Sequence, residues 1–182
     1  MKTIKQYLPI LAVAVAASLA GCSNTRTKVA DISPAIRTSL DQAGFKDVTV
    51  SQDQEKGVVT LGGHVVADAD KVNAAAIAQS MAPAQVVANE IGVIKPGVEK
   101  ADNAINSELD KGIEHNLDAA LLKDKLHKRV KYSVKNHVVT LTGEVGSETT
   151  RSRAEAVAIA VPNVHQVVNE LQVKHQKATS TN

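Results

Sequence analysis

Hydrophobic and polar positions alternate in two segments of the chain that lie eighty residues apart and are nearly identical. Residues 58–65 read VVTLGGHV, and residues 138–145 read VVTLTGEV. In the second segment, Val139 and Leu141 fall on one side of an extended chain, and Thr140 falls on the other. The pattern predicts two strands that each have one buried and one polar face.

A helix is predicted after each of these strands. Two sets of apolar residues recur at the spacing i, i+3, i+4 and i+7, which marks one face of a helix. They are Ala74, Ile77, Ala78 and Met81 in the first copy, and Ala154, Val157, Ala158 and Val161 in the second. Asp68 and Ser147 stand where N-cap residues are expected.

The repeat extends to both sides of this core. Residues 47–51 align with 129–133, and residues 89–93 align with 169–173. Each copy is therefore predicted to run helix, strand, strand, helix, strand, with a hairpin first and a right-handed crossover afterwards. Helices would cover one face of each sheet and leave the other wet. The predicted fold class is α+β, with two tandem small two-layer domains.

Two glycines and two asparagines are interpreted as structural. Gly62 and Gly143 stand near the ends of the repeated strands, where glycine suggests a tight bend or a close backbone approach. Asn89 and Asn169 fall on the core-facing side of the last strand, where a buried amide must be hydrogen-bonded. We expect these two side chains to pin the end of the strand rather than to bind a ligand.

The predicted division of the chain places domains at 29–97 and 113–175, separated by a linker at 98–112. Two interpretations of the linker region stay open. The apolar residues from Ile105 to Leu121 recur every four positions and favour one long helix. The alternative is a solvated linker followed by a short helix. The tail at 176–182 is predicted to be disordered.

The N-terminus has the pattern of a bacterial lipoprotein signal peptide over residues 1–21. Lys2 and Lys5 precede an apolar run, at 7–20, that is too short for a confident membrane anchor. The run ends in LAGC, which resembles the lipobox, and Cys22 is the only cysteine. The resemblance implies that Cys22 is acylated and that residues 22–28 form a tether. The alternative is an ordinary cleaved signal peptide with a free thiol.

Charge and composition argue against several classes of function. Lys2 and Lys5 account for the formal net charge of +2, so the rest of the chain is balanced. Beyond the signal peptide only Phe45 and Tyr132 are aromatic, too few for a base-stacking surface, so no nucleic acid is expected.

No enzyme motif is present, and no catalytic residue is predicted. The six histidines are interpreted as surface residues, because no two of them stand at i, i+4 on one helix. The sequence therefore predicts neither an enzyme, nor a metal site, nor a cofactor.

One local charge cluster is the candidate binding site. Residues 122–137 hold six cations against Asp124 alone, whereas residues 40–57 of the first copy have a net charge of −2. The six are Lys123, Lys125, Lys128, Arg129, Lys131 and Lys135. Two interpretations stay open: a solubilising charge run at a helix end, and a site for anionic lipid headgroups.

The order of these elements resembles the BON domain of bacterial envelope proteins. The pattern V-x-x-V-x-N-E-L-x-V is carried by Val164, Val167, Asn169, Leu171 and Val173. In the first copy it is carried by Ala84, Val87, Asn89, Ile91 and Val93, where Ala84 replaces the expected Val. Two such domains behind a lipobox resemble the dual-BON outer-membrane lipoproteins.

The resemblance implies a non-enzymatic lipoprotein at the periplasmic face of the outer membrane. Ser23 in place of Asp favours that membrane by resemblance to bacterial sorting rules. The family is associated with envelope or osmotic stress and with phospholipid surfaces. The expected partner is an anionic phospholipid membrane surface, which the second domain would bind in support of outer-membrane integrity or stress tolerance. The alternative is a periplasmic adaptor that docks another envelope protein.

Overall fold

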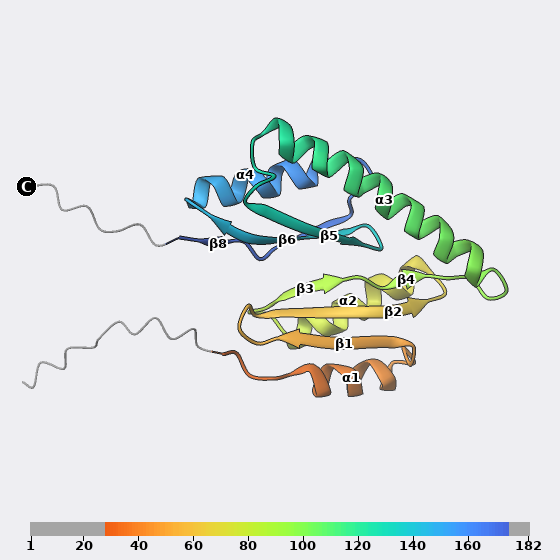
Figure 1. Ribbon diagram of the computed structural model, residues 1–182. Coiled ribbons are helices and arrows are strands. Elements are labelled where there is room, and N and C mark those ends of the chain that lie inside the picture. The colour runs from red at the N-terminus through yellow and green to blue at the C-terminus, as the bar shows by residue number, and fades with distance from the viewer. Residues whose placement is uncertain (1–27, 175–182) are drawn as a thin grey trace, which may run out of the picture.

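The computed structural model describes residues 28–174, and these residues form two domains of the same design (Figure 1). The first contains α1 (Ser33–Gln42), β1 (Val48–Asp53), β2 (Val58–Val65), α2 (Asp68–Met81), β3 (Val86–Asn89) and β4 (Gly92–Val93). The second contains α3 (Glu99–Lys123), β5 (Val130–Lys135), β6 (Val138–Val145), α4 (Glu148–Ile159), β7 (Gln166–Asn169) and β8 (Gln172–Val173). The predicted α+β class and the repeated two-layer unit are confirmed.

Both sheets have the same topology. The repeated strand, β2 or β6, is central; it pairs antiparallel with β1 or β5 and parallel with β3 or β7. The short β4 and β8 pair with the far half of the same central strand. The single third strand expected from the sequence is therefore split in two, at Glu90–Ile91 and at the equivalent Glu170–Leu171.

A duplicated core fills the space between each sheet and its two helices. In the first domain Ile36 and Leu40 of α1 and Ala74 and Ala78 of α2 pack onto the core face of β2. In the second, Leu117 and Leu121 of α3 and Ala154 and Ala158 of α4 take the same places. The helical faces predicted from the i, i+3, i+4, i+7 spacing are the buried ones. The next residue along α3, Leu122, is 56% exposed. It is Leu121 that takes the place of the buried Leu40 of the first domain.

The N-cap predictions differ in outcome between the two crossover helices. Ser147 is the N-cap of α4, and its side chain accepts a hydrogen bond from the backbone N–H of Thr150 at 3.2 Å. Asp68 is the first residue inside α2, and the N-cap is Ala67, which has no capping side chain. The prediction for Asp68 is therefore wrong by one residue, although an acid in the first turn still suits the helix dipole.

The region between the domains is one continuous helix. α3 spans 25 residues, and its C-terminal half supplies the first helix of the second domain. Its N-terminal half runs past that domain toward the first (Figure 1). No described helix combines the length and the apolar character needed to cross a bilayer. The signal peptide, Cys22 and the tail at 176–182 lie outside the described residues.

Close backbone approach explains the glycine near the end of each central strand. Gly143 has φ +123°, and a Cβ there would collide with the carbonyl oxygen of Arg129, the residue just before β5. The equivalent position in the first domain is Gly63, with φ +80° and the carbonyl of Asp47 in the same place. The counterpart of Gly143 is therefore Gly63, and not Gly62 as expected from the sequence.

Replacing Gly143 with Val is expected to destabilise the second domain by several kcal/mol. The change places a β-branched side chain at a positive φ and against a backbone carbonyl. Both the φ strain and the collision can be relieved only by moving the backbone. Thermal unfolding followed by circular dichroism measures the effect. Glu144→Ala, on the exposed side of the same strand, is the control and should shift the transition little. An unchanged transition for Gly143→Val would show that the assigned constraint is absent.

Candidate functional site: the domain junction and the basic segment

The polar face of each sheet is covered at one end by the other domain. Val58, Ala88, Val138 and Val168 form a separate apolar cluster in which every residue is at most 5% exposed. Val58 and Val138 are the first residues of β2 and β6, and both point away from the helices of their own domain. The face expected to be wet is therefore partly buried, because two such faces pack together.

The domains meet through equivalent surfaces. Val58 and Val138 are separated by the repeat offset of eighty residues, and so are Ala88 and Val168. Figure 1 shows β3 as the strand of the first sheet nearest to the second domain, and β7 is its contact across the junction. The arrangement is that of a two-fold symmetric dimer interface, made here within one chain.

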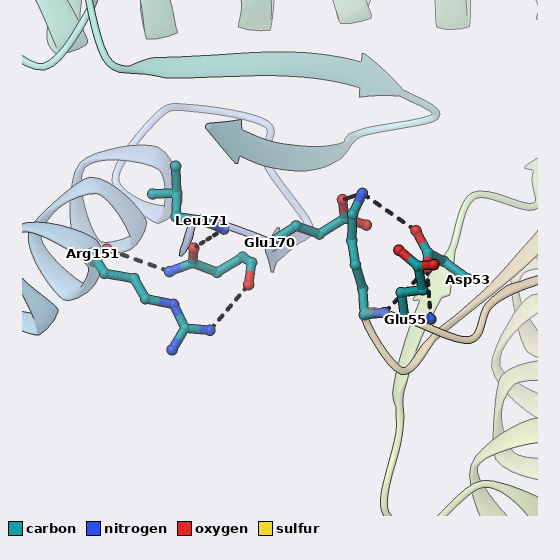
Figure 2. A network of polar contacts seen from close by, with 7 residues as sticks. Asp53, Glu55, Arg151, Glu170 and Leu171 are labelled. Carbon is teal, nitrogen blue, oxygen red and sulfur yellow. Dashed lines mark hydrogen bonds and ion pairs between the residues drawn. The ribbon is translucent and has the colours of Figure 1, made fainter. Parts of the chain in front are cut away.

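Polar contacts on either side of this apolar cluster follow the same symmetry. Lys56 Nζ lies 2.5 Å from Glu170 Oε2, and the same ammonium group is 3.4 Å from Asp53 (Figure 2). On the other side, Asn136 Nδ2 donates to the backbone oxygen of Glu90 at 2.7 Å, and Lys135 is 3.4 Å from the Glu90 carboxylate. The hydrogen bond that the Lys56 ammonium donates to Glu170 is the main reason that the pKa of Lys56 is raised.

The side chain of Gln166 makes an asymmetric contact. Its amide nitrogen donates to the backbone oxygen of Val87 at 2.7 Å, and its amide oxygen accepts from the backbone N–H of Asn89 at 2.9 Å. The side chain thereby bonds to a backbone carbonyl and a backbone N–H on the outer edge of β3, as a neighbouring strand would. The equivalent residue in the first domain is Val86, which cannot do this for β7.

Each repeated asparagine pins the break in the third strand, as predicted. Asn89 Nδ2 donates to the carbonyl of Lys71 at 3.1 Å, and its Oδ1 accepts from the N–H of Ile91 at 3.4 Å. Asn169 makes the same pair of bonds with Arg151 and Leu171, at 3.3 and 3.2 Å. Figure 2 labels Arg151 and Leu171, and dashed lines mark both hydrogen bonds.

The tip of the β5–β6 hairpin lies at the junction and is held by α3. Asn136 and His137 both have positive φ, +47° and +69°, which is the geometry of a two-residue type I′ turn. Their backbone N–H groups donate to the Asp110 carboxylate at 2.8 and 2.9 Å. The helix therefore fixes the hairpin tip against the first domain.

Two histidines meet beside this turn. The rings of His137 and His165 are 4.8 Å apart between centroids in an edge-to-face arrangement. A cavity of about 300 Å³ next to them is also lined by Lys71 from the first domain. Burial, the His165 ring and Lys71 lower the pKa of His137, in that order, against the opposing effect of Asp110.

The six cations of residues 122–137, called the basic segment here, fall into two groups in the structure. Lys123, Lys125, Lys128, Arg129 and Lys131 are exposed around the end of α3, the following turn and the start of β5. None of these five makes an ion pair within residues 28–174. Asp124, the acid among them, pairs with Arg153 of α4 instead. Lys135, at the other end of β5, is engaged with Glu90 at the junction.

The junction residues were not identified from the sequence. The pattern contained two signals: a valine on the polar face at the start of each repeated strand, and the glutamate of the repeated Asn-Glu pair. Among residues 28–174, no three His, Cys, Asp or Glu side chains are arranged to hold a metal ion.

A tandem pair of small α+β units joined through equivalent sheet faces defines the class of protein. The family model of the BON domain matches residues 28–95 and 109–175. The chain belongs to the BON-domain family.

One relative is the osmotically-inducible protein Y of Escherichia coli strain K12, which is 31% identical over 142 residues, or 74% of this chain and 67% of that protein. Two solved structures of CdsD, a structural protein of the type III secretion system of Chlamydia trachomatis, were also matched. They have TM-scores of 0.35 and 0.34 and identities of 12% and 13%. These matches cover 82% and 76% of this chain, and 100% and 90% of the CdsD chains.

Acidification is expected to weaken the junction through His137. With the junction formed, the pKa of His137 is below its ordinary value of 6.5. The unfolded protein, in which His137 has its ordinary pKa, therefore binds the proton more readily. This contribution to stability is complete above about pH 6.5 and is lost as the pH falls through the lowered pKa. The measurement is the thermal transition of the 23–182 fragment between pH 7.5 and 5.

His137→Asn is the matched variant, because asparagine also tolerates the positive φ of this turn. It should show a smaller loss of stability on acidification than the unaltered protein. Equal losses in the two proteins would contradict the assignment to His137.

Proposed function

We propose that the protein is a non-enzymatic envelope lipoprotein whose second BON domain binds anionic phospholipid. The observation that carries the proposal is the group of five exposed cations from Lys123 to Lys131, which no acid within residues 28–174 neutralises. Each Lys or Arg near an anionic membrane contributes about 1 kcal/mol, so a group of this size holds a domain at the surface.

The family and the relative support the proposed location. The Escherichia coli relative is named for osmotic induction. We extend this to a role for the present chain in outer-membrane integrity or stress tolerance, at the periplasmic face. In the view of Figure 1, the chain enters the first domain on the same side as the end of α3 and the turn into β5. An N-terminal lipid anchor and the five cations would then face one membrane.

A second candidate function is that of an adaptor that docks another envelope protein. It is favoured by two apolar side chains on the N-terminal half of α3, Ile105 and Leu109, which are 56% and 37% exposed. Binding to a defined protein that is insensitive to lipid would support this alternative, whereas binding to vesicles that falls with salt supports the first.

Charge reversal of Lys128, Arg129 and Lys131 to Glu is expected to lower vesicle binding by about a hundredfold or more. The estimate follows from about 1 kcal/mol for each cation removed, with repulsion added. Binding should also weaken as salt rises, since exposed charges are screened beyond about 8 Å at physiological ionic strength. The assay is sedimentation of the 23–182 fragment with anionic and with neutral vesicles.

The control carries the same change in net charge elsewhere. Lys28, Lys95 and Lys100 are exposed and lie outside the basic segment, and their replacement with Glu should leave most of the binding intact. If the two triple variants bind equally, or if the first variant binds as the unaltered protein does, the basic segment is only a solubilising charge run.

Replacement of Cys22 by Ser is expected to release the protein from the membrane or to leave it as the precursor. A single acyl chain binds only marginally, while two or more give stable anchoring. Fractionation and intact-mass measurement of the membrane-bound protein test this. An unmodified Cys22 in that fraction would exclude lipidation as the anchor.

A further inference from the structure

β5 is an edge strand with one exposed side. Within residues 28–174 its strand neighbour is β6, and the α3 helix packs on its core face. The Lys135–Val138 pair closes the two-residue turn, so Lys135, Ser133 and Lys131 form the hydrogen-bonded pairs with β6. Tyr132 and Val134 therefore direct their backbone N–H and C=O groups outward.

The equivalent edge in the first domain is obstructed. The guanidinium group of Arg37 on α1 donates to the carbonyl of Val48 at the start of β1 and, at 3.1 Å, to that of Lys46. The side chain of Gln52, on β1, also bonds to the backbone of Ala30 and Ile32, which precede α1, both at 2.8 Å. The Arg37 contact thus occupies one carbonyl of β1 that another strand would need, and the Gln52 contacts hold the segment ahead of α1 beside β1.

The second domain lacks this obstruction. The buried pair Ile36 and Leu40 on α1 corresponds to Leu117 and Leu121 on α3, which places Asp118 where the first domain has Arg37. A carboxylate cannot donate to a backbone carbonyl. The Tyr132 hydroxyl donates to the Glu114 carbonyl at 3.4 Å, and burial, helped by the negative charge of Asp118 nearby, raises the pKa of Tyr132.

A groove and a row of charges lie beside the open edge. The groove has a volume of about 390 Å³ and is lined by Lys111, Glu114, His115, Asp118 and Tyr132. On the opposite face of β5, Lys131 and Lys135 are both exposed and alternate with the half-buried Tyr132 and Val134. Alternation along a strand matches the alternation of side chains on a strand added next to it.

We infer that the β5 edge binds an extended acidic peptide segment of another protein as an additional strand of the second sheet. Main-chain hydrogen bonds to Tyr132 and Val134 supply the affinity of such β-augmentation. Acidic side chains at alternate positions of the peptide meet Lys131, which forms no ion pair within residues 28–174, and Lys135, whose side chain is 61% exposed beside its partner Glu90. The intervening side chains face the groove. This inference goes beyond phospholipid binding and does not depend on it.

A second copy of the chain is a poorer occupant of the same edge. Pairing two β5 strands edge to edge would bring the lysine rows of both copies together. Like charges opposite each other on paired strands are destabilising, and lysines on an edge strand are a common protection against such pairing. Charge complementarity therefore selects an acidic partner.

The test uses isotope-labelled 23–182 protein and two synthetic probes, an eight-residue peptide that alternates Glu and Thr and its Lys–Thr counterpart. Amide resonances of residues 130–135 should shift with the Glu–Thr peptide and not with the Lys–Thr peptide. Binding of neither peptide, or equal binding of both, would overturn the inference.

Two variants separate docking from folding. Val134→Pro removes an outward N–H that the sheet does not use, and Asp118→Arg installs the blocking group of the first domain. Each should weaken binding of the Glu–Thr peptide at least tenfold while vesicle binding through Lys128 and Arg129 is retained. If Asp118→Arg binds the peptide as well as the unaltered protein does, the edge is not the docking site. A peptide-independent dimer that Val134→Pro dissolves would assign the edge to a second copy instead.

Discussion

The burial of four small side chains between the two sheets is the contact on which the rest of the structure depends. Val58, Val138, Ala88 and Val168 exclude water from the ends of both polar faces, where each sheet alone would be exposed. Because these residues are short, the backbones of β3 and β7 approach closely enough for side chains to bond across the junction. The nearly buried Glu170 carboxylate then requires a partner, which Lys56 provides.

The junction also determines where the two ends of β5 are directed. The hairpin tip, with Asn136 and His137, is held between the first domain and Asp110 of α3. The start of β5 at Val130 lies six residues from Asn136, roughly 20 Å along an extended strand. The free cations around Lys128 are therefore kept clear of the first domain, whereas Lys135 lies close enough to pair with Glu90 while its side chain stays largely exposed.

Duplication has preserved the core and allowed the surfaces to diverge. Arg37 and Asp118 occupy equivalent positions, as do Val86 and Gln166, and in each of these two pairs only one residue can donate a hydrogen bond to a backbone carbonyl. At a third pair of equivalent positions, Lys56 reaches the carboxylate of Glu170, whereas Asn136 bonds to the backbone of Glu90. The first domain seals its outer edge with an arginine, while the second leaves that edge open and gathers cations beside it. The two domains share one fold and present different chemistry to their surroundings.

The sequence alone determined the repeated unit, the helical faces and the pinning role of Asn89 and Asn169. Those features depend on local periodicity and on the need to satisfy an amide that is half-buried in the structure, and both can be recognised within a single copy of the repeat. Only the tertiary structure decided that α3 is continuous, that the third strand breaks before Ile91, and that the polar face beginning at Val58 is covered. These features depend on contacts between different elements, from the bond of Asn89 to Lys71, 18 positions away, to the packing of Val58 with Val138 across the junction. Periodicity within one element contains no information about such contacts.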